Sequence, residues 1–203
     1  MNAPCYIGIT GGIASGKSTV REMLSQHPNI GSIDLDSVAR AAIYVPEHRD
    51  LLKRIFSDEV LLPNGGYNME LIKKRFFGDK AVYERASVCF RPIINRALEI
   101  EAGRMRGKKT LVLVESALLR KEALPPWLRL HYTIVVFCNR ETQILRAMER
   151  SGLSRNQVEE RLSKQPTNEE RFANGDVFIS TECNERVLNE RVSVTYDLLR
   201  PLM

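Results

Sequence analysis

A short segment near the N-terminus combines glycines, a lysine and a serine at a spacing that binds phosphate. Gly11–Ser18 has the sequence GGIASGKS and satisfies the pattern G-x-x-x-x-G-K-[ST]. Glycines let successive backbone N–H groups turn toward phosphate oxygens, where a Cβ would obstruct the approach. Lys17 would reach the terminal phosphates of a nucleotide, and the Ser18 hydroxyl would bind Mg²⁺ that bridges the same oxygens. The residues expected to contact the nucleotide are Gly12, Ile13, Ala14, Ser15, Gly16, Lys17, Ser18 and Thr19.

Three acidic residues, candidates for binding the substrate, stand where predicted strands end. Asp34 and Asp36 follow the apolar run 30–33, and Glu115 follows the apolar run 111–114. Open α/β sheets bind their ligands at the carboxyl ends of the strands. One aspartate would accept or orient the proton of an acceptor hydroxyl and the other would hold a magnesium-bound water, unless Asp36 only caps the next helix. Glu115 would act on magnesium through water or on the substrate, or would simply end its strand.

Arginines recur on two polar helices that the second half of the sequence predicts. Arg146 and Arg150 are four residues apart and therefore share one helix face. Arg161 and Gln165 have the same spacing on the next helix. Guanidinium groups that close over a triphosphate as a lid would offset the charge that develops during transfer. The alternative is a helix face that simply contacts solvent.

The elements that must position these residues alternate between strand and helix along the chain. The apolar runs 111–114 and 132–138 are continuous, which is typical of parallel strands buried on both faces. The pattern therefore predicts an α/β fold with a mostly parallel five-stranded sheet. The predicted strands are 5–10, 30–33, 111–114, 132–138 and 176–179, and the predicted helices are 17–25, 37–44, 141–149, 155–163 and 185–199.

One stretch interrupts this alternation. From 46 to 106 the sequence is charged and helical in period, with a turn at 63–66 and a break at Arg91-Pro92. We expect a helical insertion, whose apolar clusters at 51–56 and 71–77 form a core. The whole chain would be one domain, with a core of 1–45, 107–140 and 172–203, the insertion at about 46–106 and the lid at about 141–171.

Composition limits the possible partners. The 203 residues are 43% hydrophobic and 27% charged, and 30 Lys and Arg against 25 Asp and Glu leave a net charge of +5. Without a basic run or a basic stripe interleaved with aromatic residues, this excess favours a phosphate-rich small molecule over nucleic acid. The four cysteines and three histidines are scattered, which predicts neither a zinc site nor a disulfide framework. The sequence shows no secretion signal and no long apolar run, so we expect a cytoplasmic protein without membrane contact, a monomer or a weak homo-oligomer.

The strings IGITGGIASGKSTV, SIDLDSVAR, ETQILRAMER, VEERLSKQ and GDVFI resemble the dephospho-coenzyme A kinase family over nearly the whole chain. The resemblance implies a P-loop kinase three-layer sandwich whose helical insertion binds the acceptor. It implies transfer of the γ-phosphoryl group of ATP, with Mg²⁺, to the ribose 3′-hydroxyl of dephospho-coenzyme A. The products would be coenzyme A and ADP, as in the last step of coenzyme A biosynthesis. It makes Asp36 the base for that hydroxyl and gives Lys17, Arg146 and Arg150 catalytic roles.

The sequence departs from the common family pattern at several positions. Arg91-Pro92 replaces the usual His-Pro, Ala117 replaces the first residue of Pro-Leu-Leu, Tyr67-Asn68-Met69 replaces Leu-Asp-Arg, and Thr181 replaces an Asn. Two alternatives therefore remain: another small-molecule or nucleoside monophosphate kinase on this fold, or a nucleotide-binding protein of reduced activity. A nucleotide-dependent switch is disfavoured, since the sequence lacks the N-K-x-D motif that reads guanine.

Overall fold

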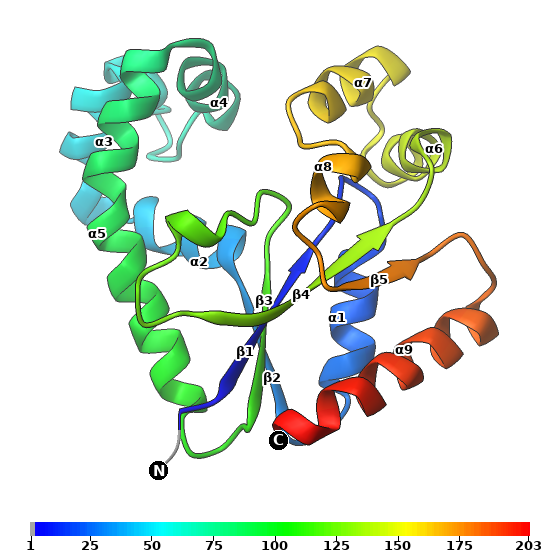
Figure 1. Ribbon diagram of the computed structural model, residues 1–203. Helices are drawn as coiled ribbons and strands as arrows, with labels where there is room; N and C mark the ends of the chain where they lie inside the picture. Colours follow the sequence, from blue (N-terminus) through cyan, green and yellow to red (C-terminus); the bar gives the residue numbers. More distant parts are fainter. Residues whose placement is uncertain (1–2) are drawn as a thin grey trace. The chain divides into compact units, whose positions relative to one another are not determined.

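A five-stranded, all-parallel sheet forms the centre of the computed structural model, which describes residues 3–203 (Figure 1). The strand order is β2-β3-β1-β4-β5, so the strand that leads into the glycine-rich loop is central. Parallel neighbours require crossover connections, which the intervening helices supply. The predicted α/β class is confirmed. The strands are β1 (Cys5–Thr10), β2 (Ile30–Asp34), β3 (Leu111–Glu115), β4 (Leu130–Phe137) and β5 (Val177–Ser180).

Local sequence signals set many of the helix ends. Ser154 begins α7 with a capping box, because its hydroxyl accepts from the Gln157 amide while the Gln157 side chain accepts from the Ser154 amide. Gly152, in the left-handed region at φ 64°, ends α6. The helices are α1 (Lys17–Ser25), α2 (Leu35–Ile43), α3 (Arg49–Phe56), α4 (Met69–Gly78), α5 (Lys80–Met105), α6 (Arg140–Ser151), α7 (Arg155–Ser163), α8 (Asn168–Phe172) and α9 (Glu185–Leu199).

Contacts divide the chain into two compact units. The first contains the residues up to Leu35 together with Ala102–Met203, and therefore holds the whole sheet, α1 and α6 to α9. The second is Asp36–Glu101, which holds α3, α4 and most of α2 and α5.

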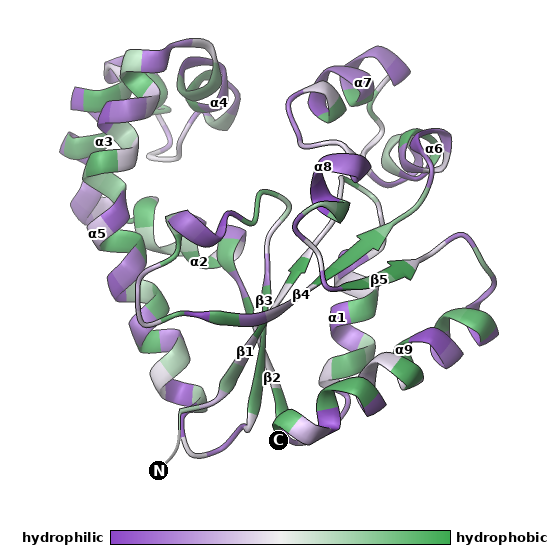
Figure 2. Ribbon diagram, in the orientation of Figure 1, coloured by the Kyte–Doolittle hydropathy of each residue, from purple (hydrophilic) through white to green (hydrophobic). Residues whose placement is uncertain are grey.

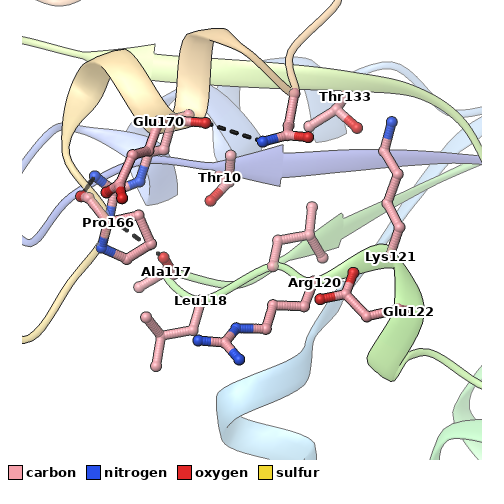
Figure 3. A pocket seen from close by; sticks show the side chains of 12 residues that line it. Thr10, Ala117, Leu118, Arg120, Lys121, Glu122, Thr133, Pro166 and Glu170 are labelled. Atoms are coloured by element: carbon pink, nitrogen blue, oxygen red, sulfur yellow. Dashed lines mark hydrogen bonds between the residues drawn. The ribbon is translucent and has the colours of Figure 1, made fainter.

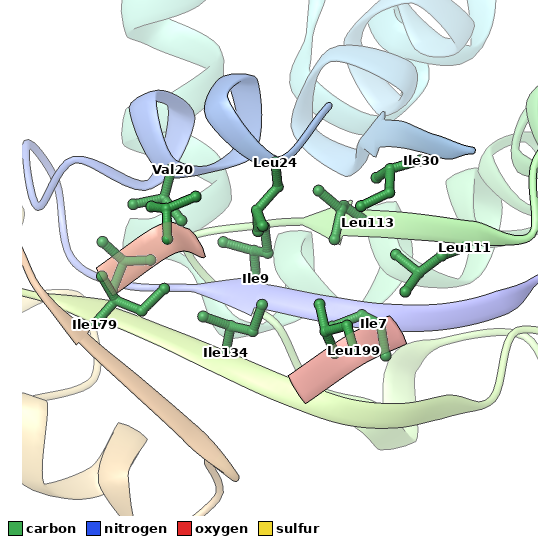
Figure 4. Close-up of a cluster of buried hydrophobic side chains, with 12 residues drawn as sticks. Ile7, Ile9, Val20, Leu24, Ile30, Leu111, Leu113, Ile134, Ile179 and Leu199 are labelled. Atoms are coloured by element: carbon green, nitrogen blue, oxygen red, sulfur yellow. The ribbon is translucent and has the colours of Figure 1, made fainter. Parts of the chain in front are cut away.

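The core of the first unit lies between one face of the sheet and two helices. Ile7 and Ile9 of β1 are fully buried and pack with Val20 and Leu24 of α1 and with Leu199 of α9 (Figure 4). In Figure 2 the strands are mostly hydrophobic, whereas α1 and α9 alternate between hydrophobic and hydrophilic residues. The side chains at 7 and 9 point to one face because strand residues alternate. This packing fixes the strand that carries the loop.

Residues of β1 that point to the other face contact the segment after β3. Tyr6 meets Trp127 edge-on, with ring centroids 6.3 Å apart. A Cβ at Gly8 would lie 2.6 Å from Cδ2 of Leu119, so a larger residue there would displace the leucine side chain that packs on the strand. The second face of β1 is thereby covered up to the point where β1 ends at Thr10.

The second unit has a hydrophobic core of its own. Leu52, Ile55 and Phe56 of α3 are buried and cluster with Ile72 of α4. Both apolar clusters predicted to form a core contribute to it, but Phe77 is 55% exposed and was wrongly included.

The structure corrects three details of the predicted elements. The helix α2 begins at Leu35, two residues before the predicted start, so Asp36 lies inside its first turn and does not cap it. The helix α5 continues through Pro92, where a break was predicted, because a proline removes only one helical hydrogen bond from a helix of 26 residues. The short helix α8 was not predicted; Thr167 and Glu170 form a capping box at its start.

Candidate active site

The loop between β1 and α1 has the backbone shape that its glycines permit. Gly16 has a φ of 89° and Ala14 a φ of 54°, both in the left-handed region. A Cβ at Gly11 would lie 2.1 Å from the carbonyl oxygen of Val136, a collision with backbone that cannot relax cheaply. Gly16 directly precedes α1, whose N-terminal N–H groups and positive dipole end favour an anion. The loop therefore has the geometry of a phosphate site.

Lys17 lies against the same loop. Its Nζ donates to the carbonyl oxygen of Gly12 at 3.1 Å, and the same oxygen accepts from the Ser15 amide at 3.2 Å. The ammonium group is therefore held over the loop, as a residue that neutralises terminal phosphates must be.

Ser18 joins the loop to the carboxylates at the ends of β2 and β3. Its hydroxyl donates to Oε1 of Glu115 at 3.0 Å. Nη1 of Arg21 lies 3.2 Å from Oε2 of Glu115 and 3.8 Å from Oδ2 of Asp34. Asp34 and Glu115 are register partners in neighbouring strands, which explains why one arginine serves both. The structure thus brings together Ser18, Asp34 and Glu115 and adds Arg21, which sequence reasoning did not identify.

This cluster fits a hard divalent cation. Mg²⁺ prefers oxygen ligands such as hydroxyls and carboxylates. Glu115 is buried, at 6% exposed, whereas Ser18 is exposed to solvent. Within residues 3–203 no group of three or more His, Cys, Asp or Glu side chains is arranged to hold a metal by itself. Magnesium sites in phosphoryl-transfer enzymes commonly combine one or two protein ligands with phosphate oxygens.

Asp36 has a different environment from Asp34. It is exposed in the first turn of α2 and belongs to the second unit, whereas Asp34 belongs to the first. A carboxylate in a first turn is stabilised by the helix dipole. The role of Asp36 as the base stays a prediction.

Arg146 of α6 is bound to the end of β5. Its Nη1 donates to Oγ1 of Thr181 and its Nη2 to the carbonyl oxygen of Thr181, both at 2.9 Å. The Thr181 hydroxyl in turn donates to the carbonyl oxygen of Ser15 in the loop at 2.9 Å. Arg150, one turn later, is exposed, and Arg161 of α7 is also exposed. The predicted arginines therefore differ in surroundings, and only Arg146 is hydrogen-bonded toward the loop.

Two glutamines also touch the loop. Oε1 of Gln165 accepts from the Ile13 amide at 2.9 Å, so the residue that was paired with Arg161 by spacing contacts the loop. Gln143 is buried beside Gly12, where an added Cβ would lie 2.8 Å from its Nε2. The segments at both ends of the predicted lid therefore contact the nucleotide loop.

A cavity of about 400 Å³ opens beside these residues. Loop residues, arginines of α6 and the segment after β5 surround it, which makes it the natural place for the sugar and base of a nucleotide whose phosphates occupy the loop. Its lining is Ala14, Gly16, Thr19, Arg146, Arg150, Thr181, Cys183, Glu185 and Leu188.

A second cavity, of about 290 Å³, lies on the face of β1 that carries Thr10 (Figure 3). Arg171 of α8 is 6% exposed at its wall and donates to the carbonyl oxygens of Pro166 and Ala117. Burial lowers the pKa of this guanidinium. Arg120 and Lys121 add positive charge to the lining, and Glu122 and Glu170 add negative charge, so three basic and two acidic side chains surround the cavity. Sequence reasoning did not identify Arg171.

The four cysteines are free thiols in the structure. Cys138, directly after β4, is buried, and this burial raises the pKa of its thiol. Of the scattered histidines, His27 stacks on Tyr196 with ring centroids 3.5 Å apart, a packing role.

Comparison with known proteins gives a family. The family model described as dephospho-CoA kinase matches residues 5–186. A dephospho-CoA kinase of Geobacter sulfurreducens is 35% identical over 190 residues, covering 92% of this chain and 94% of that protein. One from Dehalococcoides mccartyi is 31% identical over 180 residues, covering 87% and 88%.

Solved structures agree on the fold. The crystal structure of TT1252 from Thermus thermophilus superposes with a TM-score of 0.83 at 29% identity, covering 100% of both chains. A shikimate kinase from Bacteroides thetaiotaomicron, at 15% identity, has a TM-score of 0.53 over 97% of this chain and 98% of its own, which shows the shared fold alone. No helix within residues 3–203 is long and apolar enough to span a membrane. The chain belongs to the dephospho-CoA kinase family.

Proposed function

We propose that this protein transfers the γ-phosphoryl group of ATP to the ribose 3′-hydroxyl of dephospho-coenzyme A, producing coenzyme A and ADP. The observation that carries the proposal is the phosphate loop Gly11–Ser18, complete in sequence and geometry, within a chain that matches the dephospho-CoA kinase family over residues 5–186. The departures at Ala117 and Thr181 leave the loop itself unchanged.

In the proposed reaction the protein mainly positions groups and neutralises charge. The 3′-oxygen forms a bond to the γ-phosphorus while the bond from that phosphorus to the β–γ bridging oxygen breaks, and ADP leaves. A carboxylate accepts the hydroxyl proton, and Asp36 is the residue to which the family resemblance gives this role. Lys17 and Arg146 offset the charge on the transferred group and on the leaving oxygen.

The magnesium ion that accompanies ATP would be held by Ser18 and, directly or through water, by Glu115. When bound it would neutralise phosphate charge and fix the geometry of the β and γ oxygens. The hydrogen bond of 3.0 Å between Ser18 and Glu115 supports this assignment, because both oxygens already converge on one point at the end of the loop.

We assign the Arg171 cavity, on the side of β1 that carries Thr10, as the place for an anionic group of the acceptor. The family resemblance separately gives the helical insertion at about 46–106 a role in binding the acceptor. The acceptor carries a diphosphate, and the buried guanidinium of Arg171 can donate to its oxygens. Basic side chains outnumber the carboxylates of Glu122 and Glu170 in the lining. The protein would then bind only small molecules and need no nucleic acid or membrane.

The test is conversion of dephospho-coenzyme A by the purified protein with ATP and Mg²⁺. Product mass and the position of the new phosphate are determined, and AMP, shikimate and gluconate are offered as competing acceptors. Exclusive formation of coenzyme A would support the proposal. Preferential phosphorylation of another acceptor, or nucleotide binding without any transfer, would refute it.

A further inference from the structure

Thr181, directly after β5, forms hydrogen bonds with both the phosphate loop and Arg146 of α6. It is 4% exposed, and its hydroxyl donates to the carbonyl oxygen of Ser15 at 2.9 Å. The same hydroxyl accepts from Nη1 of Arg146, and the Thr181 carbonyl accepts from Nη2, both at 2.9 Å. These three hydrogen bonds, the Thr181 tether, connect segments that are 35 residues apart or more in the sequence.

The chemistry of the tether depends on a hydroxyl group. A hydroxyl donates one hydrogen bond and accepts others, so it can serve the Ser15 carbonyl and the Arg146 guanidinium at the same time. A guanidinium presents its N–H groups in a rigid planar fork, and two acceptors on one residue therefore fix its plane as well as its position.

The tether leaves the charge of Arg146 available. No carboxylate among residues 3–203 forms an ion pair with this guanidinium, whose hydrogen-bond partners are the neutral oxygens of Thr181. Arg146 lines the same cavity as Ala14 and Gly16 of the loop. A positive charge fixed beside a phosphate site stabilises the transition state without reorganising during the reaction.

We propose that Thr181 is a positioning residue for phosphoryl transfer: its hydroxyl links Ser15 of the phosphate loop to Arg146 and holds the guanidinium in its working orientation. Arg146 then acts as a fixed part of the nucleotide site and does not depend on closure of the lid for its placement. The inference rests on the proposed function for the acceptor, but it concerns only the ATP half of the site.

The first test replaces the hydroxyl without changing the shape of the side chain. Thr181→Val is expected to lower kcat about tenfold to a hundredfold, with a smaller change in the KM for ATP, because the guanidinium loses its fixed plane. Thr181→Ser keeps the hydroxyl and is expected to restore most of the turnover. The matched control is Thr195→Val, since Thr195 is also buried and its hydroxyl donates to the Arg191 carbonyl within the same helix, α9. The kcat of this control should stay within about twofold of the wild type.

A double-mutant cycle separates positioning from general damage. If Thr181 acts through Arg146, adding Thr181→Val to Arg146→Ala will not lower kcat further. Multiplying effects, or an unchanged kcat in Thr181→Val alone, would overturn the proposal. Arg146→Lys provides a variant that leaves Thr181 intact: a lysine keeps the charge but cannot span both oxygens, so a turnover close to that of the wild type would also overturn it.

The wild-type rate with dephospho-coenzyme A reports the proposed function, and the ratios between variants report the tether. If the wild type transfers no phosphate to that acceptor, the same variants are compared in an assay of Mg²⁺-dependent ATP hydrolysis. The tether predicts the same order there, with Thr181→Ser above Thr181→Val, and a reversed or flat order would refute it.

Discussion

Single residues decide how the phosphate loop is connected to the rest of the site. Ser18 and Glu115 are 97 positions apart but share a hydrogen bond of 3.0 Å, and Arg21 places its charge between Glu115 and Asp34. This arrangement joins a hydroxyl, two carboxylates and a cation at the ends of neighbouring strands. Glu115 contacts both Ser18 and Arg21, whereas Asp34 lies near Arg21. Separate substitutions can therefore test the role of each carboxylate.

Replacing Asp36 by Asn should preserve nucleotide binding and lower turnover by about 10²- to 10⁴-fold, the usual contribution of a general base. The measurements are kcat with dephospho-coenzyme A and the Kd for ATP. Asp34→Asn is the comparison, since Asp34 faces Arg21 at 3.8 Å. Near-normal turnover in Asp36→Asn with a large loss in Asp34→Asn would transfer the role to Asp34.

Replacing Glu115 by Gln keeps an oxygen acceptor for Ser18 but removes the negative charge. If Glu115 helps to hold the metal, the Mg²⁺ concentration that gives half-maximal turnover should rise about 10- to 100-fold. The matched control is Glu190→Gln, because Glu190 is exposed on α9 and its one ion pair among the described residues 3–203 is with Arg186. An unchanged Mg²⁺ requirement would show that Glu115 does not help to hold the metal and has only a structural role.

At the scale of elements, helix α6 and the segment after α7 both contact the phosphate loop. The two ends of the predicted lid reach the loop through Gln143 of α6 and through Gln165 after α7. The long helix α5 lies mostly in the second unit and contains a proline. The proline inside α5 bears on the stability of the protein, and the contacts of Gln143 and Gln165 bear on the phosphate loop.

The exposed Pro92 lies inside α5, where it cannot donate to the carbonyl of Val88. Pro92→Ala should raise the free energy of unfolding by about 1 to 2 kcal/mol. The gain is smaller than the full cost of a proline inside a helix, because alanine also increases the conformational entropy of the unfolded chain. Urea unfolding measures the change. Arg85→Ala, another exposed position of α5, should have an effect within about 0.5 kcal/mol, and a lower stability of Pro92→Ala would contradict the expectation.

At the scale of the whole molecule, ligand binding is linked to stability. Mg²⁺ and ATP at about 100 times the Kd should stabilise the folded protein by about 2.7 kcal/mol, a rise in Tm of roughly 5 to 11 °C for a chain of this length. Thermal unfolding with and without the nucleotide tests this. Lys17→Ala should lose most of the rise and abolish turnover, and an equal rise in that variant would refute the phosphate-loop assignment.

The sequence alone was sufficient for the fold class and for the phosphate loop. Both depend on local order: continuous apolar runs specify buried parallel strands, and G-x-x-x-x-G-K-[ST] specifies a loop whose chemistry is contained in eight consecutive residues. The predicted bounds of α1, α7 and α9 agree with the structure because caps and apolar spacing act within a few residues.

Only the tertiary structure decided which distant residues meet at the loop. Thr181 drew notice in the sequence only as a departure from a family pattern, yet it bonds Ser15 and Arg146. Arg21 and Arg171 carry no local signal, because an arginine on a helix is usually solvated until a partner from another element buries it. Helix α5 passes Pro92 for a similar reason: one local breaking signal is outweighed by the other bonds and contacts of a long helix. Contacts between segments far apart in the chain depend on tertiary packing, and this packing cannot be read from local patterns in a single sequence.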